Sequence, residues 1–148
     1  MNTTSKIYES LPETERPSFS VNEIIPIMKE HYDLCCSVKE LPGERDRNFL
    51  VQDKVGNLYV LKISNAAEAL DYLELQNQAL KCSAKLFDHG RIPSVIPNIN
   101  GESLSRTISS SKISHWIRLV KFVDGIPMAQ YRPHTKEFLH ELGFMCGT

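Results

Sequence analysis

Three β-prone segments followed by one long helix-prone segment constrain the fold of this chain more than any other feature of its sequence. The β-prone segments are residues 35–41, 48–52 and 58–63, and short stretches rich in turn-forming residues separate them. Consecutive strands with short connections usually pair side by side, so we expect an antiparallel meander. Residues 66–84 then hold Ala, Leu, Glu and Gln almost throughout, and these residue types favour a helix.

The segments after the long helix-prone stretch add further strands. Residues 95–98 and 103–108 are β-prone, and the Asn-Gly dipeptide between them is typical of a hairpin. Residues 115–123 predict a last strand, and residues 135–146 predict the beginning of a helix. The predicted fold is therefore α+β, with five or six mostly antiparallel strands and one long helix between the third and fourth strands.

The N-terminal part of the chain predicts a flexible segment and then a helix. Residues 1–18 are polar and contain two prolines, without the apolar run of a secretory signal. Ser20 and Glu23 have the spacing of a capping box, and Phe19 can pack against Ile24 as a hydrophobic staple. We expect this helix to continue to about residue 32.

Composition and charge narrow the class of protein. Of the 148 residues, 41% are hydrophobic and 24% are charged, which is typical of one globular domain. The net charge of −1 gives no electrostatic reason to expect a nucleic acid or an anionic membrane as a partner. No apolar stretch approaches the ~20 residues of a membrane span. The four cysteines have no metal-binding spacing, so we expect reduced, buried thiols in a cytoplasmic protein.

Lys62 is the first residue that could carry chemistry. It ends the third predicted strand on the same face as Leu58 and Val60, because side chains alternate across a sheet. A lysine on an apolar face is unfavourable unless an anion meets it, such as a nucleotide phosphate or a helix-borne carboxylate. Glu74 on the following helix is the carboxylate that we favour, with Gln76 as the alternative. The other interpretation is that Lys62 ends an edge strand and points into water.

Two backbone segments could complete a nucleotide site around Lys62. The loop at residues 42–47 could cover phosphates with its N–H groups and with Arg45 or Arg47, although a plain charged turn would account for it in isolation. Residues 119–125 leave the sheet as an extended segment, whose backbone groups could pair with the edge of a purine ring. The alternative there is a strand that runs into a turn.

A covering loop, an inward lysine, an acidic helix and a hinge-like strand occur here in the chain order of a kinase small lobe. Four segments carry a more specific resemblance: residues 48–51, 59–65, 74–77 and 117–125. The most specific is Tyr-Val-Leu-Lys-Ile-Ser-Asn at 59–65. These segments resemble the N-terminal part of the aminoglycoside phosphotransferase (APH) and choline kinase-like family. The nearest branches are the hydroxylysine kinase-like proteins and the kinase domains fused to class III aminotransferases.

The resemblance implies a role for each part of the site. Lys62 would hold the α- and β-phosphates of ATP, positioned by Glu74 or by its rivals Gln76 and Asn77. Val60 would form part of the adenine roof. The other implied residues belong to the phosphate-covering loop or to the adenine-binding hinge: Gly43, Arg45 and Arg47 in the loop, and Lys121, Phe122 and Val123 in the hinge. The two loop arginines depart from the polar or acidic residues expected there.

The catalytic residues of that family do not occur in this sequence. Family members place a His-Gly-Asp-x-x-x-x-Asn loop and a metal-binding Asp motif in a larger second lobe, and none of the five histidines here precedes Gly-Asp. We therefore predict no catalytic and no metal-binding residue. The expected domains are a flexible segment at 1–18, an ATP-binding N-terminal lobe at 19–124, and at 125–148 a linker with the first helix of a truncated second lobe.

The parent enzyme implied by the resemblance is an ATP-dependent kinase for a hydroxyl group of an amino acid or amine, such as hydroxylysine. It would bind ATP or GTP, with Mg²⁺ held through the missing lobe, and this chain would be incomplete for catalysis alone. The alternative is a non-catalytic nucleotide-binding or regulatory module with the same fold, and an unrelated α+β binding domain is a third possibility. Exposed apolar residues of the last helix also predict weak self-association: Leu139, Leu142, Phe144 and Met145.

Overall fold

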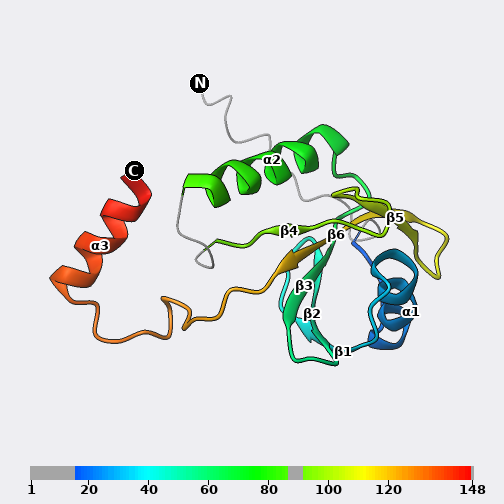
Figure 1. Cartoon of the computed structure of the whole chain (residues 1–148), viewed down its shortest axis with the longest axis horizontal. Helices are drawn as coiled ribbons and strands as arrows, with labels where there is room; N and C mark the ends of the chain where they lie inside the picture. Colours follow the sequence, from blue (N-terminus) through cyan, green and yellow to red (C-terminus); the bar gives the residue numbers. More distant parts are fainter. Residues whose placement is uncertain (1–15, 87–91, 148) are drawn as a thin grey trace, which may run out of the picture.

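The computed structural model describes residues 16–86 and 92–147, and within them the chain forms three helices and six strands (Figure 1). In chain order these are α1 Val21–Tyr32, β1 Cys36–Leu41, β2 Arg47–Asp53, β3 Leu58–Ile63, α2 Leu70–Leu86, β4 Val95–Ile96, β5 Ser105–Ile108, β6 Ser114–Lys121 and α3 Lys136–Gly147. Most of the N-terminal segment that was predicted to be flexible lies outside the described residues. Within it, Pro17 is buried.

The described strands form one antiparallel sheet in the order β1-β2-β3-β6-β4, with β5 also paired to β6. The predicted α+β fold, with a long helix between the third and fourth strands, is confirmed. The predicted hairpin between β4 and β5 is wrong, because both strands pair with β6 and follow each other along its edge. The Asn-Gly dipeptide instead lies in a short loop that a 2.8 Å hydrogen bond from the Asn98 N–H to the Glu102 carbonyl closes.

Helix α1 covers one face of the sheet and forms the apolar core there. The capping box predicted for its first turn is present, since the Glu23 carboxylate accepts hydrogen bonds from the N–H and hydroxyl of Ser20. The helix and the alternate strand residues that face it are buried together: Ile24, Ile27, Met28 and Tyr32 from α1, with Phe49, Val51, Leu61, Ile63, Ile117 and Leu119 from the sheet. This face contributes hydrophobic stability.

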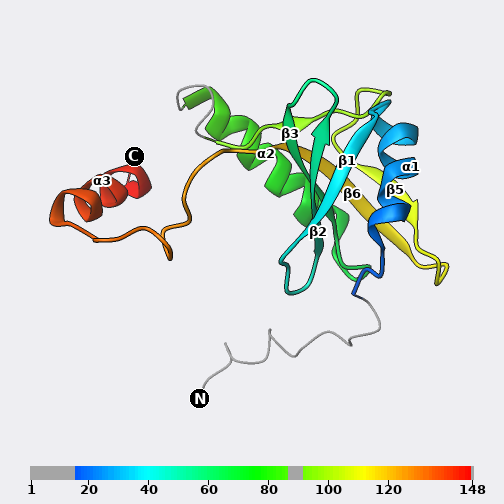
Figure 2. The ribbon, with the colours of Figure 1, turned by 90° about the horizontal axis from the view of Figure 1, so that it is seen from below.

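Helix α2 lies across the opposite face of the sheet (Figure 2). It begins at Leu70 rather than near residue 66, because the preceding residues form a turn in which Asn65 accepts the N–H of Ala67 with its side chain. Of the described residues of this helix, Leu73 and Asn77 are buried, whereas Leu70 is exposed. The helix therefore presents an amide as well as an apolar side chain to the sheet.

The segment after β6 runs away from the sheet and carries α3 at its end (Figures 1 and 2). None of the α3 side chains described is buried. The four cysteines are free, and Cys35, Cys82 and Cys146 are exposed while Cys36 is half-buried, so the prediction of buried thiols is wrong. Within the described residues no helix is long and apolar enough to cross a membrane.

Candidate functional site

A row of three polar residues crosses the sheet beneath α2. The strand register places Lys62 of β3 directly opposite Asn48 of β2 on one side and Arg118 of β6 on the other. All three belong to the face opposite the apolar core, because side chains alternate along each strand. Neighbours in such a row have Cβ atoms about 5 Å apart. The fold therefore brings two cations from distant parts of the sequence side by side.

An apolar row lies beside this polar row on the same face. Leu50, Val60 and Val120 are paired across β2, β3 and β6, and Val95 of β4 extends the row. Positions two residues apart along a strand are separated by about 7 Å. An apolar strip next to a cationic row could hold a ligand with a hydrophobic ring at one end and an anion at the other.

Lys62 is half-buried and has no counter-ion in close contact. Within residues 16–86 and 92–147, no hydrogen bond or ion pair reaches its ammonium group. Burial lowers the pKa of Lys62, the charge of Arg118 lowers it further, and the carboxylate of Asp46 opposes both effects. Like charges directly opposite each other on a sheet are destabilising. An anionic ligand would relieve both the desolvation and the repulsion.

Arg118 is the most deeply buried charge of the row, with 5% of its surface exposed. It donates a 2.8 Å hydrogen bond to Oδ1 of Asn77 and another to Oε1 of Gln76, both on α2. Burial lowers the pKa of Arg118, while the charges of Asp46 and Glu68 raise it. Because its two hydrogen-bonded partners are neutral amides, its positive charge is not cancelled by an ion pair within the described structure.

Three buried polar atoms around this row have no hydrogen-bond partner among the described residues. They are Nε of Arg118, Nδ2 of Asn77 and Oδ1 of Asn48. Most buried polar groups in proteins are hydrogen-bonded, so such a cluster calls for an explanation. Donors and an acceptor left open beside two cations are what a polar ligand, or water in its absence, would satisfy.

The loop between β1 and β2 folds closely against the end of the polar row. Nδ2 of Asn48 donates a 3.2 Å hydrogen bond to the Pro42 carbonyl, and the Asp46 carboxylate accepts a 3.2 Å hydrogen bond from the Asn65 N–H. Gly43 is required here, because a Cβ atom at this position would lie 2.4 Å from the Asp46 carbonyl oxygen. The glycine thus permits a close approach of backbone to backbone.

Between this loop and α2 lies a depression of about 300 Å³. Its walls are the loop and β2 on one side and the beginning of α2 on the other: Glu44, Arg45, Asp46 and Asn48, with Glu68, Tyr72 and Gln76. Arg45 forms a 3.7 Å ion pair with Glu68 across it. The depression connects the loop with Asn48 and Gln76, the immediate neighbours of Lys62 and Arg118.

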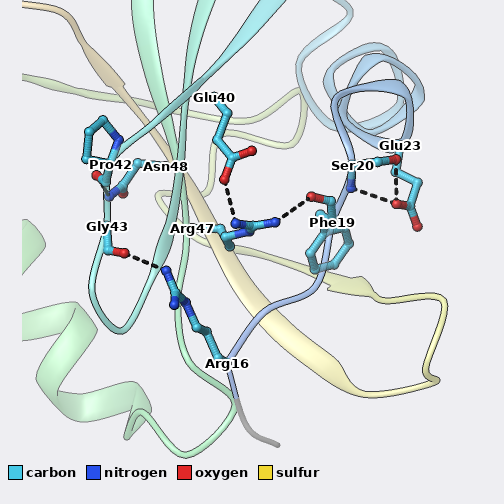
Figure 3. A network of polar contacts seen from close by, with 9 residues as sticks. All are labelled: Arg16, Phe19, Ser20, Glu23, Glu40, Pro42, Gly43, Arg47 and Asn48. Atoms are coloured by element: carbon cyan, nitrogen blue, oxygen red, sulfur yellow. Dashed lines mark hydrogen bonds and ion pairs between the residues drawn. The ribbon is translucent and has the colours of Figure 1, made fainter. Parts of the chain in front are cut away.

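The two loop arginines lie on opposite faces of the sheet. Arg45 faces the depression, whereas Arg47 forms an ion pair with Glu40 and donates a hydrogen bond to the Phe19 carbonyl (Figure 3). Arg16 reaches the same loop from the N-terminal segment and donates a 2.6 Å hydrogen bond to the Gly43 carbonyl. The structure therefore places Gly43 and Arg45 near Asn48, at the end of the polar row, and it places Arg47 on the α1 side.

Glu74, which was expected to pair with Lys62, lies elsewhere. It is exposed and lines a separate depression of about 700 Å³ between α2 and the segment before β5, together with Trp116 and Leu104. No ion pair joins it to Lys62 in the described part of the chain. The turn of the helix decides this, because Gln76 and Asn77 occupy the inward side. The two alternatives to Glu74 thus face the polar row, but they contact Arg118.

Two of the three N–H groups of the predicted hinge already donate hydrogen bonds to backbone carbonyls of neighbouring segments. The Lys121 N–H donates to the Ser94 carbonyl at 2.8 Å, and the Phe122 N–H donates to the Leu58 carbonyl at 3.0 Å. The N–H of Val123 makes no hydrogen bond with a described residue. Of the three hinge N–H groups, that of Val123 is the one available to a ligand.

Sequence reasoning did not identify Arg118, Asp46 or Asn48 as members of the site. A signal existed for Arg118, because an arginine between the apolar residues of a strong strand prediction must be buried and therefore needs partners. Its position next to Lys62 depends on the pairing of β3 with β6, which the sequence pattern does not specify. Among the described residues no group of three or more His, Cys, Asp or Glu side chains could hold a metal ion.

Comparison with known proteins bears on this arrangement. No family model matches the chain. Over 141 residues the chain is 28% identical to a hydroxylysine kinase of Danio rerio, and the match covers 90% of this chain and 38% of that protein. The chain is similar to a small-molecule kinase. The predicted resemblance to the hydroxylysine kinase-like branch is confirmed.

A solved structure supports the fold independently. The microcompartment-associated aminopropanol kinase superposes with a TM-score of 0.55 and 15% identity, over 72% of this chain and 33% of that chain. At this level of identity the likeness concerns the fold, and it confirms the predicted small-lobe architecture. The chain spans between 33% and 38% of the lengths of these two kinases.

Proposed function

We propose that this chain is the ATP-binding N-terminal lobe of a phosphotransferase that phosphorylates a hydroxyl group of an amino acid or amine, of the hydroxylysine type. The observation that carries the proposal is the half-buried ammonium of Lys62, which lacks a close counter-ion and lies beside the buried guanidinium of Arg118. Two adjacent cations near a backbone loop would favour the binding of a phosphate group on electrostatic grounds. The similarity to a hydroxylysine kinase supports the choice of acceptor class.

The two rows on the α2 face suggest how a nucleotide would lie. The phosphates would meet Lys62, with Gly43 and Arg45 of the loop above them. The adenine ring would cover the apolar strip at Val60, and its edge would pair with the backbone at Val123. Leu58 and Lys62 are four positions apart on β3, a distance of about 13 Å, which suits an elongated ligand with a ring at one end and an anion at the other.

The chemistry assigned to this chain is binding rather than phosphoryl transfer. Phosphoryl transfer needs a residue that orients the acceptor hydroxyl and carboxylates that hold Mg²⁺. We propose that both are supplied by residues outside this sequence, in which no His-Gly-Asp motif occurs. Glu74 has no direct part in this arrangement, and the choice between ATP and GTP depends on backbone contacts at residues 121–123.

The same absence of a catalytic motif favours a second candidate function. The chain would then be a non-catalytic nucleotide-binding or regulatory module with a kinase small-lobe fold. Both functions require the Lys62 site, and they differ in whether a catalytic lobe works with it. The two functions can be distinguished by adding a separately produced polypeptide that contains the catalytic motif of a homologous kinase. Phosphorylation of hydroxylysine should be restored if this chain is the ATP-binding lobe of a kinase, and it should not be restored if the chain is a non-catalytic module.

Thermal unfolding with MgATP tests nucleotide binding directly. A ligand that binds only the folded state stabilises it by about 2.7 kcal/mol at a hundredfold excess over its Kd. We expect millimolar MgATP to raise the Tm of the wild type, Lys62→Ala to abolish this increase, and Lys54→Ala in the exposed β2–β3 turn to retain it. An unchanged Tm in the wild type would refute nucleotide binding, and a full increase in Lys62→Ala would refute the assignment of Lys62.

Two further properties follow from the exposed surface. Free, exposed cysteines suit a reducing compartment, so we propose a cytoplasmic location for the protein.

Leu139 is 48% exposed on α3, and with the other apolar residues of that helix it would support weak self-association. Light scattering should show an average mass that rises with concentration, and less so in Leu139→Glu. A constant monomer mass over the whole range would contradict self-association.

A further inference from the structure

Arg118 connects the sheet to α2 more directly than any other charged residue described. Its guanidinium comes from the middle of β6, and its two terminal nitrogens donate to the side-chain carbonyls of Gln76 and Asn77 on successive positions of α2. Arg118 and Asn77 are 5% and 3% exposed. A planar guanidinium that is hydrogen-bonded at two nitrogens fixes the rotation of the helix as well as its distance from the sheet.

The partners of Arg118 leave its charge in place. A buried arginine is usually met by a carboxylate, which cancels the charge as it satisfies the donors. Here amides satisfy two donors without cancelling it, and the nearest cross-strand neighbour is the ammonium of Lys62. The other groups around this pair are Asn48 from β2, Asp46 from the loop and Glu68 from the turn before α2. Glu68 is already paired with Arg45, so the single negative charge of Asp46 faces the two positive charges of Lys62 and Arg118.

We infer that Arg118 is a positioning residue of the proposed nucleotide site, with two separable effects. Its forked hydrogen bonds hold α2 against β6, and its uncancelled charge beside Lys62 favours an anionic ligand at that lysine. Gln76 serves the first effect as a hydrogen-bond acceptor and the second because it is neutral, since a carboxylate there would hold the helix but cancel the charge. The inference rests on the proposed function of Lys62 and deepens it.

The charge effect is tested by Gln76→Glu, with Gln78→Glu as the matched control. Both variants add one carboxylate to α2 in place of an amide of the same shape, but Gln78 is exposed while Gln76 contacts Arg118. We expect Gln76→Glu to weaken MgATP binding by about tenfold in calorimetry, because hydrogen-bonded charge pairs are strong. Gln78→Glu should bind like the wild type. Unchanged or tighter binding by Gln76→Glu, or an equal loss in both variants, would overturn the inference.

A titration without nucleotide provides a second readout. The pKa of Lys62, followed through the NMR signals of its Cε methylene, should rise in Gln76→Glu because the repulsion from Arg118 is compensated. It should not change in Gln78→Glu. If the wild type fails to bind MgATP, the proposed function fails, and this titration still decides the inference. A pKa of Lys62 that is the same in wild type and Gln76→Glu would show that Arg118 does not act on it.

The paired hydrogen bonds from Arg118 to Gln76 and Asn77, which we call the clamp, are tested separately. Arg118→Lys keeps the positive charge but removes the planar guanidinium that makes both hydrogen bonds. We expect the amide protons of α2 to exchange faster with solvent in this variant while the pKa of Lys62 stays low. Should Arg118→Lys fail to fold, Asn77→Ala removes one of the two acceptors and should have the same, smaller effect on exchange. Wild-type exchange of α2 in a folded variant of either kind would exclude the clamp.

Discussion

The two faces of this sheet are built from the same strands but bury side chains of opposite character. Toward α1, alternate residues such as Phe49, Leu61 and Ile117 are fully buried among other apolar groups. Toward α2, the residues between them include Asn48, Lys62 and Arg118, with polar atoms that have no partner among the described residues. One face thus supplies stability to the fold, and the other can carry unfavourable charges that a ligand would satisfy.

In many proteins a stable core likewise supports a functional site that is itself unfavourable for stability. Uncompensated buried charge lowers the stability of the fold, and it persists only where the rest of the structure is stable enough to offset this loss. Here the α1 core lies directly behind the polar row, on the same strands. The difference between the two faces can be tested in order of expected effect, starting with the core.

The largest effect is expected for Leu61→Ala. Leu61 is fully buried on the α1 face, and truncating a buried leucine lowers the free energy of unfolding by about 2 to 5 kcal/mol. Leu58 lies on the same strand but on the α2 face and is half-buried, so Leu58→Ala should cost about 1 kcal/mol. Urea unfolding of both variants measures the difference. Equal losses would show that the two faces contribute alike to stability.

Alkaline pH should weaken the α1 face through Tyr32. Burial raises the pKa of Tyr32 to about 12, against an ordinary value of 10.0. The unfolded chain therefore loses this proton first, and stability falls as pH rises above 10. By about pH 11 the wild type should have lost about 1.4 kcal/mol more than Tyr32→Phe. Tyr72→Phe is the control, because Tyr72 is 52% exposed. Parallel pH curves for wild type and Tyr32→Phe would disprove the assignment.

The α2 face should respond to pH in the opposite sense. The pKa of Lys62 is lowered from 10.5, so between its folded value and 10.5 the unfolded chain binds more protons and stability increases with pH. Lys62→Met should abolish this increase and, by removing the repulsion from Arg118, raise stability at neutral pH by up to about 1 kcal/mol. Lys54→Met serves as the exposed control. A large loss of stability in Lys62→Met would mean that the lysine is a structural rather than a ligand-binding group.

The smallest effect is expected where the N-terminal segment contacts the loop (Figure 3). Arg16→Ala removes one exposed hydrogen bond to the Gly43 carbonyl, so the loss in stability should be about 0.5 kcal/mol or less. Hydrogen exchange at residues 43–46 should nevertheless become faster. Ser18→Ala, at an exposed position of the same segment, should leave exchange unchanged. If Arg16→Ala also leaves it unchanged, the segment does not restrain the loop.

Local patterns explain why much of the fold could be predicted. The alternation in β1, β2 and β3, the capping box at Ser20 and the composition of α2 each depend on residues close together in the sequence. The same alternation placed Lys62 and Val60 on one face of β3. The role of Lys62 stays a prediction, but its place on a half-buried, cationic face follows from the strand pattern.

The composition of the site around that lysine was decided by tertiary structure. Pairing of β3 with β6 brings Arg118 beside Lys62 across 56 positions of sequence, and no local pattern specifies that register. The rotation of α2 turns Gln76 and Asn77 inward and leaves Glu74 exposed, because the helix is oriented by its contacts with Arg118. Edge pairing with β6 likewise prevented the predicted β4–β5 hairpin. The sequence by itself determined the elements and the face of Lys62, whereas long-range contacts determined its neighbours.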